Sequence, residues 1–200
     1  MMISNKMNFV IASNNIKKAK ELENILYHLG YQSIIYSELM PYIQFPNEQN
    51  NSLEQNACTK AEFISHYLNN ELVIADDTGL YLDAFPQEYG VSTKRQLMKE
   101  CKNGNFNQYL LNKVKEKDRK MTLRSVVALA QNGVIIAKGA GKMRGKIALE
   151  ELGNMSTGFD KIVIPDGSTK TIAQMDWNTR FLYLHRAIAL QNLLKKRNFS

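Results

Sequence analysis

Two adjacent carboxylates, Asp76 and Asp77, follow the apolar run 72–75 near the middle of the chain. We expect this run to be a short buried strand that the aspartates close. Like charges beside a low-dielectric core repel one another unless a cation joins them. Mg²⁺ prefers carboxylate oxygens together with phosphate oxygens and water, so the pair is typical of a magnesium–nucleotide site. An exposed acidic turn at 76–79 is the alternative interpretation.

A second polar group, Ser13-Asn14-Asn15, precedes Lys17 and Lys18. It lies between the β-rich run 8–12 and apolar residues at helical spacing, so it is predicted to join a strand to a helix. Free backbone N–H groups and the dipole at a helix N-terminus attract anions. A hydroxyl, an amide and an ammonium placed there can hold a triphosphate. Alternatively, Ser13 or Asn15 only caps the helix and the lysines are solvated.

A third group, Arg180, His185 and Arg186, lies at the start of the expected last helix. Arginine offers planar donors for a phosphate or a base carbonyl, and histidine can hydrogen-bond to a purine edge. A single histidine is more often a packed or surface residue, which is how we interpret His28 and His66. The third group therefore indicates a nucleotide site only in combination with the other two groups.

The elements that must position these groups follow a mixed α/β pattern. Asn132-Gly133 between two β-rich runs predicts a hairpin, because both residues tolerate positive φ. A break near Gly104 divides a helical stretch. The predicted strands are 8–12, 72–75 with an extended continuation at 80–82, 123–130, 134–138, 142–149 and 161–164. The first predicted helix begins after residue 15 and ends near Gly30, and the other helical ranges are 52–68, 94–117 and 180–196.

The composition of the 200-residue chain fits one domain, or one domain with a small lobe, and 44% of its residues are hydrophobic. Cys58 and Cys101 lack metal-binding spacing, so we expect neither a zinc site nor a disulfide scaffold. The N-terminus lacks the apolar core of a signal peptide, so we expect a soluble cytoplasmic protein without a membrane anchor. The net charge of +7 attracts polyanions, but only 195–197 forms a basic run.

In this order, the three groups resemble the inosine triphosphate pyrophosphatase family of house-cleaning nucleotide hydrolases. The family's opening T-G-N-x-x-K corresponds to residues 12–18. Its E-N-A-x-x-K-A helix and A-D-D-[ST]-G-L segment correspond to 55–61 and 75–80. Its V-D, G-x-x-S-A-R, K-T-x-A and S-H-R segments are similar to Asp83, 90–95, 170–173 and 184–186. The resemblance covers residues from about 9 to 194, and the ordered set is far more specific than any single motif.

The resemblance implies a fold and an assembly. The fold is α/β, with an elongated mixed central β-sheet flanked by helices, and is also called anticodon-nuclease-like. Residues 1–200 would form one ITPase-like domain with two lobes and a nucleotide cleft between them. The family usually forms a homodimer.

The resemblance also implies the site. Asp77 would activate the attacking water, Lys18 would assist, and Asp76 and Asp77 would hold Mg²⁺ with Glu48 completing the metal site. His185 and Arg186 would read the 6-oxo group of a purine. The full set of implied substrate-binding residues is Ser13, Asn14, Asn15, Lys18, Thr78, Thr157, Gly158, Phe159, Asp160, Arg180, His185 and Arg186.

The implied reaction is the Mg²⁺-dependent hydrolysis of non-standard purine triphosphates (ITP, dITP and XTP) to the monophosphate and pyrophosphate. The chain departs from the family mainly around the base. The family's G-F-G-Y-D-P is reduced to 157–161, in which Phe159 is the aromatic that could stack on the base. Leu184, Gln174 and Asn14 replace a serine, a glutamate and a glycine of the family's motifs. The reaction is therefore better supported than the substrate.

Three alternatives stay open: a nucleotide-binding relative without activity, a pyrophosphatase for modified pyrimidine triphosphates, and a nucleic-acid-binding module suggested by charge. The last is disfavoured, because the sequence shows neither a clustered basic stripe nor aromatic stacking platforms. The enzyme hypothesis makes one spatial demand: the turn that carries Lys18 must face the aspartate pair.

Overall fold

A computed structural model describes residues 8–46 and 52–196 and shows an α/β fold around one mixed sheet. The strand order is β2-β1-β3-β5-β6-β7, and β4 pairs with β3 off this path. β1 is parallel to both β2 and β3, whereas β3–β4 and β6–β7 are antiparallel. The mixed sheet predicted from the sequence is confirmed. The strands are β1 Asn8–Ile11, β2 Gln32–Ile35, β3 Leu72–Leu82, β4 Phe85–Gly90, β5 Lys120–Gln131, β6 Val134–Ile147 and β7 Val163–Pro165.

Helices connect these strands. They are α1 Ile16–His28, α2 Leu53–Ser65, α3 Thr93–Glu100, α4 Phe106–Lys113, α5 Trp177–Phe181 and α6 His185–Lys195, with short 3₁₀ turns η1 Tyr36–Glu38, η2 Gly158–Lys161 and η3 Ile172–Gln174. No helix in the described ranges is long and apolar enough to cross a membrane.

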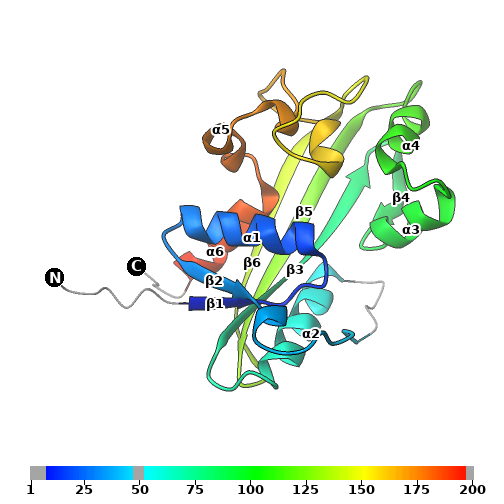
Figure 1. The fold of residues 1–200 in the computed structure, drawn as a ribbon. Coiled ribbons are helices and arrows are strands. Elements are labelled where there is room, and N and C mark those ends of the chain that lie inside the picture. The colour runs from blue at the N-terminus through cyan, green and yellow to red at the C-terminus, as the bar shows by residue number, and fades with distance from the viewer. Residues whose placement is uncertain (1–7, 47–51, 197–200) are drawn as a thin grey trace. The chain divides into compact units, whose positions relative to one another are not determined.

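The chain divides into two compact units. The first comprises Met1–Asp77, Ser125–Gly141 and Arg186–Ser200; the second comprises Thr78–Arg124 and Lys142–His185. In the first unit, the apolar strand β1 is buried between β2 and β3, and Val10 aligns with Ile34 on one side and Val73 on the other. Parallel neighbours need a crossover, which α1 supplies between β1 and β2. Figure 1 shows α1 together with β1 and β2.

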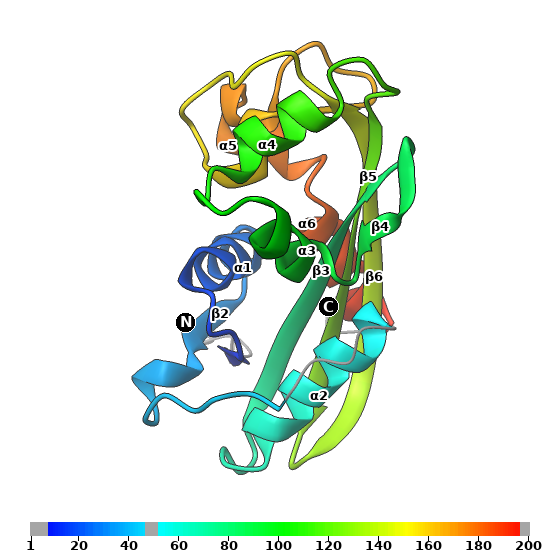
Figure 2. The same cartoon turned by 90° about the vertical axis from the view of Figure 1, so that its right-hand side faces the viewer.

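α2 packs its small and branched residues into the core of the first unit. Ser52 caps it by accepting a hydrogen bond from the backbone N–H of Gln55 (3.2 Å). Its buried apolar stripe consists of Leu53, Ala57, Ala61 and Ile64. Figure 2 shows α2 beside β3. This placement brings the polar residues next to the stripe within reach of the strand.

In the second unit, Lys113 of α4 contacts both β4 and α3. Its ammonium pairs with Glu88 of β4 (2.5 Å) and Glu100 at the end of α3 (3.4 Å), and it lies 4.9 Å from the ring centroid of Phe85. Burial alone would lower the pKa of Lys113, but its bonds to Glu88 and Tyr89 outweigh this and raise the pKa. Figure 1 shows α3, α4 and β4 together.

Two predicted turns are confirmed. Asn132 and Gly133 both have positive φ (50° and 75°) and join β5 to β6 in a hairpin. Gly104, with φ of 73°, lies between α3 and α4, as the predicted helix break requires.

Several predicted boundaries were wrong. Asp76 and Asp77 do not close a short strand, because β3 continues through them from Leu72 to Leu82. The runs 134–138 and 142–149 belong to one long strand, β6, up to Ile147. The helix predicted at 180–196 is two helices, α5 and α6. The strands β2 and β4 were missed.

Candidate active site

The continuity of β3 decides how the two aspartates point. Consecutive side chains of a strand project from opposite faces, so Asp76 and Asp77 extend to different sides of the sheet. Their partners follow this alternation. Asp76 meets residues of α1 and α6, whereas Asp77 meets residues of α2. Each carboxylate is thus compensated by its own set of donors.

Asp76 lies between two cations. Arg186 donates from Nε to its Oδ2 (2.8 Å), and the Lys18 ammonium lies 3.8 Å from the same oxygen. The side chain of Asp76 is only 1% exposed. Burial alone would raise its pKa, but Lys18, Arg186 and Lys60 outweigh this and hold the pKa of Asp76 well below its ordinary value. Asp76 is therefore ionised throughout the physiological range.

Lys18 experiences the same cluster from the other side. Burial has the largest effect and lowers the pKa of Lys18; Asp76 opposes this, whereas Arg186 and Lys60 reinforce it. Lys18 belongs to the first turn of α1, and Asp77 also acts on its pKa. The turn that carries Lys18 faces Asp76, as the sequence predicted, whereas Asp77 contacts α2 and influences Lys18 only through its charge.

Glu21 extends the cluster along α1. It lies three residues after Lys18, on the same face of the helix, and accepts a hydrogen bond from Nη1 of Arg186 (2.6 Å). Arg186 thus bridges Glu21 and Asp76 with two different nitrogens. The sequence interpretation missed Glu21, although its spacing from Lys18 was an available signal.

Asp77 is held by two residues of α2. Asn56 donates from Nδ2 to Oδ2 (2.9 Å), and the Lys60 ammonium lies 3.3 Å from Oδ1. Ser125 of β5 donates to the backbone carbonyl of Asp77 (3.3 Å). Both α2 residues fell within a segment that resembles the family, but no role was predicted for them. Their partner, Asp77, follows only from the packing of α2 against β3.

The first turn combines capping with fixed side chains. Asn15 caps α1, because its Oδ1 accepts from the backbone N–H groups of Lys17 and Lys18 (3.1 and 3.4 Å). Asn14 accepts from the Tyr36 hydroxyl and donates to the carbonyl of Ile43 (3.0 Å). Asn15 therefore caps the helix, as the alternative interpretation predicted. Its two hydrogen bonds fix the backbone that carries Lys18.

The remaining predicted substrate-binding residues, apart from Ser13 of the first turn, belong to the second unit. Ser156 and Asp160 share a hydrogen bond (2.5 Å), and Gly158 accepts from buried Asn107 (2.8 Å). Thr157 is exposed, Thr78 and Phe159 are half-buried, and His185 is buried.

Arg180 adds an aromatic neighbour that the sequence interpretation missed. Its Nη1 donates to the carbonyl of Met155 (2.6 Å), and its guanidinium lies 4.9 Å from the ring centroid of Trp177. A planar cation over an indole forms a cation–π contact. Trp177 is thereby a candidate stacking residue of the second unit.

The predicted magnesium ligands are Asp76, Asp77 and Glu48, and their chemistry can be compared with what Mg²⁺ requires. Glu48, the predicted third ligand, lies outside the described residues. Within the described ranges, no group of three metal-ligating side chains gathers. Mg²⁺ is commonly held by one or two carboxylates, with phosphate oxygens and water completing the octahedron. The ionised carboxylate of Asp76 fits that chemistry, and a protein cage is not required.

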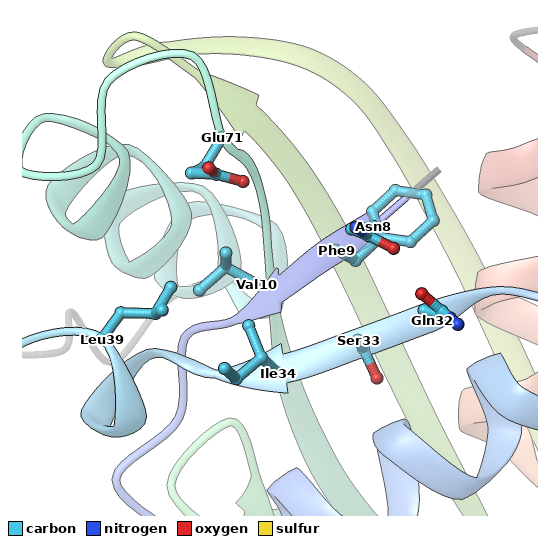
Figure 3. A pocket seen from close by; sticks show the side chains of 8 residues that line it. All are labelled: Asn8, Phe9, Val10, Gln32, Ser33, Ile34, Leu39 and Glu71. Atoms are coloured by element: carbon cyan, nitrogen blue, oxygen red, sulfur yellow. The ribbon is translucent and has the colours of Figure 1, made fainter. Parts of the chain in front are cut away.

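A cavity of about 310 Å³ opens beside β1 and the edge strand β2 (Figure 3). The only ionisable side chain in its lining is Glu71, so it offers no positive charge to a phosphate. The lining consists of Asn8, Phe9, Val10, Gln32, Ser33, Ile34, Leu39 and Glu71. Positive charge gathers instead around the aspartates.

The chain is similar to known proteins over most of its length. The model of the Ham1 family matches residues 9–196. A dihydroneopterin triphosphate diphosphatase of Limosilactobacillus reuteri is 46% identical over 189 residues, which cover 94% of this chain and 97% of that protein. A dITP/XTP pyrophosphatase of Leuconostoc mesenteroides is 32% identical and covers 95% and 96%. The Staphylococcus aureus Ham1 protein superposes with a TM-score of 0.73 at 30% identity, covering 92% and 94%.

Proposed function

We propose a substrate and a mechanism from the premise that this chain belongs to the Ham1 family and is a nucleoside triphosphate pyrophosphatase of that family. The proposed reaction is hydrolysis between the α- and β-phosphates of a triphosphate whose head group is a fused bicyclic ring with an oxo group. The products are the monophosphate and pyrophosphate. The observation that carries this proposal is the cluster of Lys18, Lys60 and Arg186 around two buried aspartates.

We propose dihydroneopterin triphosphate as the preferred substrate. The relative with that activity is 46% identical, against 32% for the dITP/XTP pyrophosphatase. The sequence departs from the ITPase motifs at 157–161 and Leu184, in segments expected to contact the base. A pterin and a hypoxanthine share a fused bicyclic ring with an oxo group beside a ring nitrogen. ITP, dITP and XTP are therefore the second candidate substrates.

Asp77 is proposed to take a proton from the attacking water. Asn56 and Lys60 hold one oxygen each, which fixes the direction of the carboxylate. Lys18 is proposed to receive the phosphate chain near the first turn, where Ser13 and Asn15 also lie. Such positioned bases commonly contribute about 10² to 10⁴ in rate.

Magnesium is proposed as the cofactor. Asp76, Asp77 and Glu48 are the candidate ligands, and Asp76 has the supporting chemistry described above. When bound, the ion would supply charge neutralisation of the phosphates and of the departing pyrophosphate. Arg186 is proposed to balance the charge of Asp76, because two of its nitrogens already bond Asp76 and Glu21.

The residues proposed to contact the head group are Thr78, Thr157, Gly158, Phe159, Asp160, Arg180 and His185, together with Trp177. Donors that meet an oxo group would be left unpaired by an amino group, which supports strong discrimination against ATP. A homodimer is proposed from the resemblance to the ITPase family alone.

A substrate panel tests the proposal. Pyrophosphate release is measured from dihydroneopterin triphosphate, ITP, XTP, dUTP and ATP, each with Mg²⁺ and with EDTA. We expect the highest kcat/KM with dihydroneopterin triphosphate, lower values with ITP and XTP, and loss of activity in EDTA. A preference for dUTP would contradict the head-group assignment and favour a pyrimidine pyrophosphatase. Binding without pyrophosphate release would favour an inactive relative.

A further inference from the structure

Two polar residues of α2 are buried where a helix usually carries apolar side chains. Asn56 is 2% exposed and Lys60 is 8% exposed. They are four residues apart and so lie on one face of α2, next to the apolar stripe that includes Ala57 and Ala61. A buried amide or amine is costly without a partner. Their shared partner is Asp77.

The two donors differ in what they can do to the carboxylate. Asn56 reaches Oδ2 at 2.9 Å through a short side chain with two torsions. Lys60 reaches Oδ1 at 3.3 Å through a flexible four-carbon stem. The amide is therefore the more rigid of the two contacts, and it comes from a helix whose N-terminus is capped by Ser52.

We propose that Asn56 is a positioning residue, which acts on the reaction only through the orientation of the Asp77 carboxylate. The proposal rests on the proposed function, in which Asp77 takes the proton from water. With Asn56 in place, Oδ2 is directed toward α2, and the carboxylate plane is fixed while Lys60 can shift toward a phosphate. Without it, the Asp77 side chain is free to turn about its torsions.

Asn56→Leu tests this, since leucine preserves the branched shape but donates no hydrogen bond. We expect kcat to fall by about 10²-fold, the scale associated with misplacing a reacting group. KM should change by less than about threefold, because Asn56 is not proposed to touch the substrate. Asn56→Asp is the second variant, in case burial of leucine prevents folding. It has the same size but sets a second carboxylate against Asp77, so kcat should fall as well.

Ser65→Ala is the matched control. Ser65 is also buried on α2, and its hydroxyl accepts a hydrogen bond from the backbone N–H of Gly133 (2.9 Å), away from Asp77. We expect Ser65→Ala to lower the unfolding midpoint while kcat stays near that of the parent. If Asn56→Leu loses stability but retains kcat, as the control does, the role of Asn56 is structural and the proposal is overturned.

A readout without substrate separates this proposal from the proposed function. The side-chain amide of Asn56 is observed by ¹H–¹⁵N NMR and assigned by its absence in Asn56→Leu. We expect the signal to shift in Asp77→Ala and to stay in place in Ser65→Ala. An amide that does not respond to Asp77→Ala overturns the proposal. If the parent hydrolyses no triphosphate, the proposed function fails, whereas the amide signal still decides whether Asn56 holds Asp77.

Discussion

At the scale of single residues, the charges around the two aspartates of β3 balance, and all of them are partly or fully buried. Three cations, Lys18, Lys60 and Arg186, face three carboxylates, Asp76, Asp77 and Glu21. Ionised groups withdrawn from water are costly unless they are paired and hydrogen-bonded. Such clusters also recur at sites that bind charged substrates. The chain therefore maintains a pre-formed set of cations where a polyanion is proposed to bind.

Asp77→Asn should separate chemistry from folding. Asparagine retains the size of the side chain and an oxygen that Asn56 can donate to, but it cannot take a proton. We expect kcat to fall by about 10² to 10⁴-fold, with the far-UV spectrum of the parent. Asp166→Asn, at an exposed aspartate of the second unit, is the control and should retain activity. Full turnover in Asp77→Asn would remove Asp77 from the role of base.

At the scale of elements, locally encoded features could be predicted from the sequence. α1 follows from apolar spacing and a capping residue, and the hairpin follows from Asn132-Gly133. β2 has only four residues, and β4 contains Pro86 within a largely exposed run, so both lack a strong pattern. The break between α5 and α6 has no Gly or Pro, although Asp176, which caps α5, was a usable signal.

The aspartate pair inside β3 shows that the partners of a buried charge cannot be predicted from the sequence. Asp76 and Asp77 looked like the end of a strand, because ionised residues are rarely buried in one. They continue the strand because α1, α2 and α6 bring cations and an amide to both of its faces. Those partners are between 17 and 110 residues away in sequence. The site residues were predictable from motif order, whereas their pairing required the packed structure.

Gly133 gives a prediction for the hairpin. Both Gly133 and Gly30 have positive φ (75° and 87°), which costs a residue with a Cβ about 1 kcal/mol. A Cβ at Gly133 would also meet the His66 ring, whereas a Cβ at Gly30 would meet no heavy atom of the described residues within 4 Å beyond its own chain neighbours. We expect urea unfolding to show a larger loss of stability for Gly133→Ala than for Gly30→Ala, by about 1 kcal/mol or more. Equal losses would mean that His66 turns aside freely.

At the scale of the whole molecule, the net charge of +7 is poorly informative about function. The cations that matter are few, and those around the aspartates are partly or fully buried. A polynucleotide would meet the exposed lysines, whereas a phosphate chain must compete with carboxylates for the inner ones. The stability of the chain should therefore respond more strongly to the state of the buried cluster than to its overall charge.

Acid unfolding measures that response. The pKa of Asp76 is held below its ordinary value in the folded chain, whereas an unfolded aspartate binds its proton at about pH 3.9. Between these two values the unfolded state binds more protons, so stability falls as the pH falls. The contribution of Asp76 is fully present above the unfolded pKa and is lost progressively below it, as the pH falls toward the lower pKa of the folded chain.

Asp76→Asn should therefore be less stable than the parent near neutral pH, because Lys18 and Arg186 lose the carboxylate that they share, and Arg186 retains only Glu21. The difference between the two proteins should shrink as the pH is lowered from about 5 toward about 2, since only the parent has an aspartate here that takes up a proton on unfolding in that range. Urea unfolding of both proteins at stepped pH gives the two curves. Curves that stay parallel through the acid range would show that Asp76 is not the carboxylate that ties the stability of the cluster to pH.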